Sequence, residues 1–310
     1  MKKSLQILIS ALAFSVLALL TLSQASAQTG RFDTMTMAEK VAAGESYHGR
    51  QAVPLEPFRI VGNIYFVGST NIGIYLIATP EGHILVDSGV NEMSSTIRDS
   101  VEKLGFRMSD IKIMLSSHAH FDHVQAHAVL QRMTGAQVMA LEADADALEA
   151  GRDLSPLGFE GWEPVKVDRR LQDGESISLG GTTMTPTLVP GHTPGCTTWS
   201  TDTQDDPQNP GETVNVVIFG CNGPNDGVQI VNNPRFPTLA EDSLFGFDNL
   251  DKLNPDIYLT GHPEAPFEGI MEQLRVQVRP HPLLQQQPWH ELVAERRASI
   301  EARIAEERGR

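Results

Sequence analysis

The sequence lacks the features that mark several large classes of protein. It has 24 basic against 39 acidic residues, and the net charge of −15 argues against nucleic acid or an anionic membrane surface as a partner. Beyond the first 27 residues no apolar segment is long enough to span a bilayer. There is no low-complexity tract and no Gly/Ser- or Pro-rich linker, which favours one domain over several. A Gly-x-Ser-x-Gly elbow and a phosphate-binding glycine loop are also missing, which excludes two common kinds of active site.

The first 27 residues have the pattern of an export signal. Lys2 and Lys3 precede the largely apolar stretch Leu5–Leu22, and Ala25-Ser26-Ala27 offers a cleavage site of small residues. Because these two lysines are the only charges in that segment, its removal would change the net charge from −15 to −17. We therefore expect residues 28–310 to form a single mature domain that is periplasmic or secreted and free of the membrane. The oligomeric state stays open.

Four potential metal ligands lie within six positions, in His118-Ala-His120-Phe-Asp122-His123. Imidazole nitrogen suits zinc and carboxylate oxygen also binds it, whereas burying these groups without partners would be costly. The cluster follows the apolar, β-branched run Ile111–Leu115, which predicts a strand. It therefore belongs to a loop at a strand end, where rigid elements commonly display functional side chains.

Two more histidines occur in similar settings. His192 follows a predicted strand in Pro190-Gly191-His192-Thr193-Pro194-Gly195, and His262 follows another in Gly261-His262-Pro263. Asp87 also ends a strand, and we expect it to orient a ligand histidine. His127 lies four residues after His123, and we expect it to flank the pocket or to hydrogen-bond nearby without binding metal. Three strand-end histidine contexts in one chain predict a shared metal site.

The chain has only two cysteines, Cys196 and Cys221, and their role stays open. In an exported protein a pair suggests a disulfide. Cys221, however, follows the strand-like run Val216–Phe219 and Gly220, the kind of position that delivers ligands, and a thiolate there would bind zinc. A metal ligand, a disulfide and a buried thiol are the three alternatives.

The hydrophobic pattern alternates between strand-rich and helical segments, with this order occurring twice. This favours two similar halves in which paired sheets are covered by helices. The last helix is highly charged and has one apolar stripe of Leu292, Ile300 and Ile304. The predicted strands are Ile60–Val67, Ile72–Ala78, Ile84–Asp87, Lys112–Leu115, Gln137–Ala140, Ser176–Gly180, Thr182–Val189, Thr197–Ser200 and Val214–Phe219; the predicted helices are Met37–Gly44, Met93–Leu104, Val124–Met133, Ala143–Ala150, Leu239–Leu253, Pro266–Val276 and Glu291–Glu307.

The ligand motifs, with Gly191-His192 and Gly261-His262, resemble those of the metallo-β-lactamase superfamily. The stretches Phe58–Gly89, Gly180–Trp199 and Asn233–Pro263 are similar to subclass B3 metallo-β-lactamases. The resemblance implies a four-layer αββα sandwich of the α/β (α+β) class, with metals at one edge of the two sheets.

The resemblance also implies roles for the ligands. His118, His120 and His192 would hold one zinc, and Asp122, His123 and His262 a second. The implied activity is β-lactam amide hydrolysis by a metal-bridging hydroxide that Asp122 helps to orient, with antibiotic resistance as its consequence.

The chain departs from B3 enzymes around Cys221. Where they carry Ala-Asp-Ser-Leu-Ser, this chain has Gly220-Cys221-Asn222-Gly223-Pro224, without the serines that seat the antibiotic carboxylate. Asn222 or Asn225 are the candidates to replace them. Cys221 takes the place of the aspartate and resembles the B1 ligand cysteine, which suggests a hybrid second site. The alternative function is a related dinuclear zinc hydrolase acting on another ester, lactone or amide.

Overall fold

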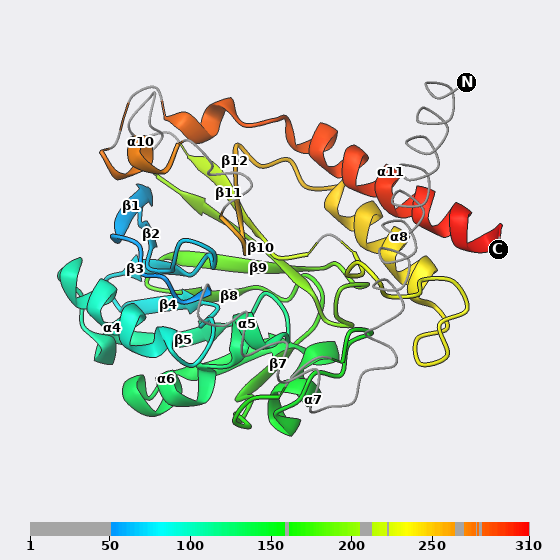
Figure 1. The fold of residues 1–310 in the computed structure, drawn as a ribbon. Coiled ribbons are helices and arrows are strands. Elements are labelled where there is room, and N and C mark those ends of the chain that lie inside the picture. The colour runs from blue at the N-terminus through cyan, green and yellow to red at the C-terminus, as the bar shows by residue number, and fades with distance from the viewer. Residues whose placement is uncertain are drawn as a thin grey trace, which may run out of the picture.

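Two β-sheets packed face to face form the centre of the protein (Figure 1). This computed structural model describes residues 51–158, 161–204, 213–221, 223–263, 270–276, 278 and 281–309. The first sheet has the strand order β1-β2-β3-β4-β5-β6-β7, and the second has the order β12-β11-β10-β9-β8. The predicted export signal, the predicted helix Met37–Gly44 and Asn222 lie outside the described residues.

The first sheet is antiparallel from β1 to β4 and parallel from β4 to β7. The turn at Gly62-Asn63 separates the first two strands, and Gly62 adopts a φ of 53° that favours glycine. The strands are β1 (Phe58–Val61), β2 (Ile64–Phe66), β3 (Tyr75–Thr79), β4 (Gly82–Val86), β5 (Ile111–Leu115), β6 (Gln137–Leu141) and β7 (Arg169–Leu171).

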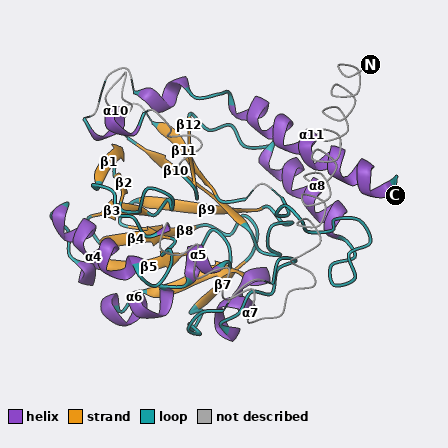
Figure 2. Ribbon diagram, in the orientation of Figure 1, coloured by secondary structure: helices purple, strands orange, loops and turns teal. Residues whose placement is uncertain are grey.

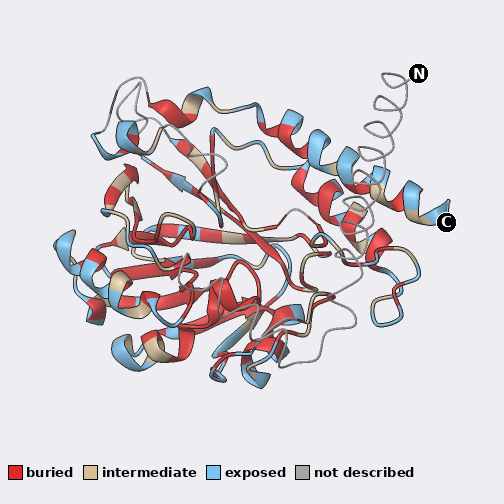
Figure 3. Ribbon diagram, viewed as in Figure 1, coloured by how far each residue is buried: buried red, intermediate tan, exposed pale blue. Residues whose placement is uncertain are grey.

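The second sheet is antiparallel except for the parallel pair β11 and β12. Its strands are β8 (Ile177–Leu179), β9 (Thr182–Leu188), β10 (Thr197–Thr203), β11 (Val214–Phe219) and β12 (Ile257–Thr260). The inner faces of both sheets contribute to one apolar core, and most of the sheet ribbon is coloured as buried (Figure 3). Trp199 of β10 and Ile77 of β3 are fully buried in this core.

Helices cover both outer faces, which makes four layers (Figure 2). Helices on one side pack on the first sheet through a second apolar cluster, and helices on the other side pack on the second sheet through a third. The helices are α4 (Met93–Lys103), α5 (Phe121–Val124), α6 (His127–Thr134), α7 (Glu142–Ala150), α8 (Leu239–Leu250), α10 (Met271–Arg275) and α11 (Trp289–Arg308); α4, α6 and α7 cover the first sheet, and α8 and α11 the second. The predicted αββα sandwich is confirmed.

Several local predictions need correction. The single helix predicted over Val124–Met133 is two helices, because the chain leaves helical geometry at Ala126 between α5 and α6. The short edge strand β7 was not predicted, since its sequence Arg-Arg-Leu has no strand pattern of its own. The apolar stripe of α11 is confirmed, with all three predicted residues buried. Among the described residues, no helix combines the length and apolarity needed to cross a membrane.

Candidate metal centre

The clustered ligands lie where β5 passes into α5. The strand ends at Leu115, His120 is still extended, and the helix that begins at Phe121 contains Asp122 and His123. In a continuous strand, neighbouring side chains would point to opposite faces. The change from extended to helical backbone instead allows side chains a few residues apart to meet.

Loops from the second sheet complete the site. His192 lies between β9 and β10, and His262 lies two residues after β12. The preceding residue, Gly261, must be small, because an added Cβ would lie 2.8 Å from Cε1 of His123. The three strand-end histidine contexts therefore meet at one edge of the sandwich, as predicted.

The first predicted ligand set is brought together. The nearest ligand nitrogens of His118, His120 and His192 lie within 4.8 Å of one another. Their ring centroids are 4.5–4.9 Å apart, and the first two side chains are almost completely buried. One divalent ion placed among them would be in reach of three imidazoles.

Two members of the second predicted set, His123 and His262, have the spacing of ligands in one coordination shell. Nε2 of His123 lies 3.4 Å from Nε2 of His262. Two nitrogens bound to one tetrahedral zinc are about 3.3 Å apart, because each Zn–N bond is about 2.05 Å. Oδ1 of Asp122 lies 3.9 Å from Nε2 of His123, and its other oxygen, Oδ2, lies 3.8 Å from Nε2 of His262. Asp122 and His123 have ligand atoms within 4.8 Å of one another and of a nitrogen of His118, so a metal ion at Asp122 and His123 would also lie near the first set.

Each of the five histidines has one ring nitrogen at hydrogen-bond distance from a protein oxygen. If that nitrogen carries the proton, the other nitrogen of a neutral ring has a free lone pair for a metal. The pairs are His118 Nδ1 with Ser117 Oγ (3.1 Å), His120 Nε2 with Ser155 Oγ (2.9 Å), His192 Nδ1 with the Gly223 carbonyl (3.0 Å), His123 Nδ1 with Asp87 Oδ2 (2.9 Å) and His262 Nδ1 with the Asn71 carbonyl (3.0 Å). His120 would thus bind through Nδ1 and the other four through Nε2.

Asp87 holds two parts of the site. Its carboxylate accepts hydrogen bonds from the Ser117 backbone N–H (2.6 Å) and hydroxyl (2.7 Å), besides that from His123. It is buried and has a φ of 65°, which is uncommon for a residue other than glycine. The predicted contact of Asp87 with a ligand histidine is present, and it keeps the His123 ring in a fixed orientation.

Two rings of the first set, His118 and His192, are kept neutral by burial and by repulsion from neighbouring imidazolium charges. Burial, followed by the neighbouring histidines, lowers the pKa of His118 well below its ordinary value, and burial does the same to the pKa of His192. Burial also acts on His123, but the charges of Asp122 and Asp87 outweigh it and raise the pKa of this ring. Neutral imidazoles bind a metal without first losing a proton.

His127 is buried, and its Nδ1 lies 2.6 Å from Ser88 Oγ. The hydrogen bond predicted for this residue near the site is therefore present. Burial lowers its pKa to about 4. The unfolded chain, with a pKa near 6.5, therefore takes up this proton first as the pH falls. We expect metal-free protein to lose about 3 kcal/mol of unfolding free energy through His127 between pH 6.5 and pH 4. Denaturant titrations across this range should show a shallower pH dependence for His127→Gln, and parallel curves would contradict the assignment.

Ser155 was not identified from the sequence, where it is one polar residue in a loop. Its hydroxyl lies 2.9 Å from Nε2 of His120 and also accepts a hydrogen bond from the Leu157 backbone N–H at 3.1 Å, and the residue is buried.

We expect Ser155→Ala to weaken binding of the first metal by about 10- to 100-fold, because the proton on Nε2 of His120 loses its acceptor. Competition with a chromophoric chelator measures this, with the exposed Ser95→Ala as control. Unchanged affinity in Ser155→Ala would show that Ser155 does not orient the ring.

Asp144 of α7 was also missed, because an acidic helix such as Glu142–Ala150 reads as solvent-exposed. The side chain is buried, and burial raises its pKa. Its oxygens accept hydrogen bonds from the Ala119 N–H (2.8 Å), the Thr193 hydroxyl (2.6 Å) and the Gly195 N–H (2.7 Å). One carboxylate therefore joins the loop of His118 and His120 to the loop of His192.

The structure joins Cys221 to Cys196 in a disulfide with a Cα–Cα distance of 6.3 Å. A sulfur bonded to another sulfur has no thiolate to donate to a metal. The prediction of Cys221 as a ligand of the second metal is therefore wrong for this structure, and the disulfide alternative is the one observed.

The predicted substrate contacts receive no direct support. Asn222 lies outside the described residues. The Asn225 carbonyl accepts a hydrogen bond from Arg303 at 3.0 Å, and its Oδ1 is buried without a hydrogen-bond partner in the described part of the chain. A role in substrate binding stays a prediction for both.

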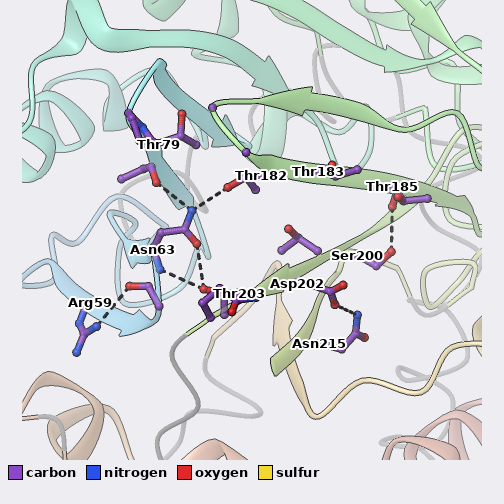
Figure 4. Close-up of a pocket in the computed structure, with 17 residues that line it drawn as sticks. Arg59, Asn63, Thr79, Thr182, Thr183, Thr185, Ser200, Asp202, Thr203 and Asn215 are labelled. Atoms are coloured by element: carbon purple, nitrogen blue, oxygen red, sulfur yellow. Dashed lines mark hydrogen bonds between the residues drawn. The ribbon is translucent and has the colours of Figure 1, made fainter. Parts of the chain in front are cut away.

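A polar cavity of about 820 Å³ lies at the other end of the strands (Figure 4). Asn63 donates to the Ala78 carbonyl and to Thr182 Oγ1, and its own oxygen accepts from Thr203 Oγ1. These bonds join the two sheets. We therefore interpret this cavity as a structural junction and not as the active site.

Comparisons with known proteins agree with this geometry. Residues 68–204 match the family model of the metallo-beta-lactamase superfamily. A metallo-β-lactamase of Cronobacter sakazakii is 32% identical, with a TM-score of 0.76 over 85% of this chain and 100% of that one. FEZ-1 from Legionella gormanii is 32% identical, with a TM-score of 0.78 over 83% of this chain and 98% of its own. BJP-1 of Bradyrhizobium japonicum, a subclass B3 enzyme, is 30% identical, with a TM-score of 0.73 over 84% of this chain and 97% of its own.

More distant curated relatives match only in part. A hydroxyacylglutathione hydrolase of Hyphomonas neptunium is 29% identical over 94 residues, which cover 30% of this chain and 29% of that protein. Another, from Methylobacterium nodulans, is 28% identical over 124 residues, 40% of each chain. The likeness that covers 83–85% of the chain is to metallo-β-lactamases, one of them a subclass B3 enzyme, and together with the family model it shows that the chain belongs to the metallo-β-lactamase superfamily.

Proposed function

We propose that this protein is a zinc-dependent β-lactamase that hydrolyses the β-lactam amide bond and confers antibiotic resistance from the periplasm. The observation that carries the proposal is the meeting of six candidate ligands at one edge of the sandwich, each histidine with one ring nitrogen at hydrogen-bond distance from a protein oxygen. The likeness of the chain, over more than four-fifths of its length, to metallo-β-lactamases that include the subclass B3 enzyme BJP-1 supports the substrate class.

The residues have separate tasks in this proposal. His118, His120 and His192 would hold one zinc, and Asp122, His123 and His262 the other. Bound zinc supplies activated water at neutral pH and polarises the substrate carbonyl. Asp122, whose side chain is 11% exposed, lies between the two groups and would orient the attacking water by accepting its proton in a hydrogen bond. The histidines that surround Asp122 keep its pKa lowered against the opposing effect of burial, so it is available as an anion.

The test uses purified, zinc-loaded protein with a penicillin, a cephalosporin and a carbapenem. We expect turnover that is lost on treatment with a chelator and restored by zinc, and raised antibiotic tolerance when the full-length chain is expressed in a susceptible host. Absence of turnover for all three compounds would overturn the β-lactamase proposal. Turnover that survives complete metal removal would overturn the zinc mechanism instead.

A second candidate is a thioester hydrolase of the same dinuclear type. The partial match to hydroxyacylglutathione hydrolases and the absence of the B3 serines near Cys221 favour it. Measuring kcat/KM for a hydroxyacylglutathione and for the three β-lactams in one zinc-loaded preparation separates the two. A higher kcat/KM for the thioester would make this the function.

A further inference from the structure

The disulfide joins the same two loops that hold His192. Cys196 lies four residues after His192, and Cys221 lies two residues before Gly223. His192 Nδ1 lies 3.0 Å from the Gly223 carbonyl, so a hydrogen bond and a covalent bond both connect these loops. In the oxidised protein, the carbonyl that orients His192 is therefore covalently tied to the loop that carries this histidine.

The same sulfurs lie close to His118. A ring nitrogen of His118 and the sulfurs of Cys196 and Cys221 lie within 4.8 Å of one another, and all three residues are buried. The Thr197 N–H donates to the Ser117 carbonyl at 2.7 Å, which keeps the start of β10 against the His118 loop. A Cβ on Gly220 would lie 2.7 Å from Cβ of Ser117, so β11 also ends close to this loop. His118 thus belongs to three groups of potential ligands: one with His120 and His192, one with Asp122 and His123, and one with the cysteine pair.

We propose that the Cys196–Cys221 disulfide decides which ligand set His118 belongs to. While the bond is intact, neither sulfur is a thiolate, and His118 is free to act with His120 and His192. When the bond is reduced, the two thiolates and the His118 imidazole form an alternative metal site, the thiolate site, that suits zinc, cobalt(II) or cadmium(II). A metal in that site would withdraw His118 from the catalytic set. The inference rests on the proposed catalytic metal centre.

The redox step is an ordinary exchange with an external dithiol. One thiolate of the dithiol attacks a cysteine sulfur and forms a mixed disulfide, while the other cysteine leaves as a thiolate. The second thiol of the dithiol then closes its own disulfide and releases the first cysteine. Two electrons and two protons are transferred to the cysteine pair, and metal binding later releases the thiol protons. An oxidising compartment therefore keeps the catalytic ligand set.

Cobalt(II) is the probe for the thiolate site, because thiolate coordination produces a charge-transfer absorption in the near ultraviolet. Metal-free wild-type protein is prepared oxidised, and also reduced with dithiothreitol that is then removed without oxygen. We expect the band only in the reduced sample, and β-lactam turnover at least about tenfold lower there than in the oxidised sample. Reoxidation should abolish the band and restore turnover. A reduced, folded protein without the band, or the same band in the oxidised protein, would overturn the inference.

The chain contains no other cysteine, so any thiolate signal comes from this pair. The Cys196→Ser/Cys221→Ser double variant should give no band and no response to dithiothreitol, and a response would contradict the inference. If this variant does not fold, the wild-type measurement still decides, with circular dichroism checking the fold of both samples. Oxidised protein that binds two cobalt ions without hydrolysing β-lactams would contradict the proposed function alone, because the redox-dependent band is measured without substrate.

Discussion

Replacing Asp122 with asparagine is expected to lower hydrolysis by about a thousandfold, which corresponds to about 4 kcal/mol of transition-state stabilisation. The carboxylate lies 3.8–3.9 Å from the ligand nitrogens of His262 and His123 and is the anionic member of the second set. An amide of the same size keeps the packing but removes the charge that a divalent ion needs. It also removes the anionic acceptor for the water.

Steady-state kinetics and metal analysis of the same samples test this expectation. The Asp122→Asn variant should hold about one zinc where the wild type holds two, with an unchanged melting temperature in the metal-free state. Asp99→Asn, an exposed carboxylate on α4, is the control and should behave like the wild type. Nearly full activity with two bound zinc ions in Asp122→Asn would refute the assigned role.

Replacing Asp144 with alanine is expected to reduce the unfolding free energy by at least about 3 kcal/mol. Three donors, at Ala119, Thr193 and Gly195, lose their acceptor, and an unsatisfied buried group costs about 1 to 3 kcal/mol. Because those donors belong to the loops of His118, His120 and His192, the first metal should also bind more weakly. The effect reaches the metal although Asp144 is not a predicted ligand.

Denaturant unfolding of metal-free protein measures the first effect, and zinc competition measures the second. Asp146→Ala is a matched control, because it lies on the same helix with a side chain that is 73% exposed and pairs with Arg170. A surface ion pair contributes about 0 to 1 kcal/mol, so this variant should be only slightly destabilised. Equal losses in the two variants would show that Asp144 does not join the ligand loops.

The predicted ligand sets depended on short patterns that fold locally. The strand Ile111–Leu115 is followed by the candidate ligands of the His118–His123 segment. His192 and His262 likewise follow the ends of strands. Strand ends of one sandwich meet at common edges, so the convergence of these histidines could be expected from the sequence. The layer order followed from the alternation of strands and helices for a similar reason.

Contacts between distant segments could not be predicted in this way. Ser155 and Asp144 occur in sequence contexts typical of a loop and of an exposed helix, and only folding places them against His120 and the two ligand loops. The break between α5 and α6 has the same origin, because Ala126 leaves helical geometry while its N–H bonds to Gly89. No periodicity encodes such a bond.

The sequence alone determined the fold and predicted a metal site, because hydrophobic period and ligand type are properties of short segments. Only the tertiary structure decided what the cysteines do. Cys221 has the local setting of a ligand, and residues 196 and 221 are 25 positions apart. Their pairing depends on how β10 and β11 place two buried sulfurs near each other and near His118. The pairing of the two cysteines depends on the distance between separate strands, and the residues of a single segment do not determine that distance.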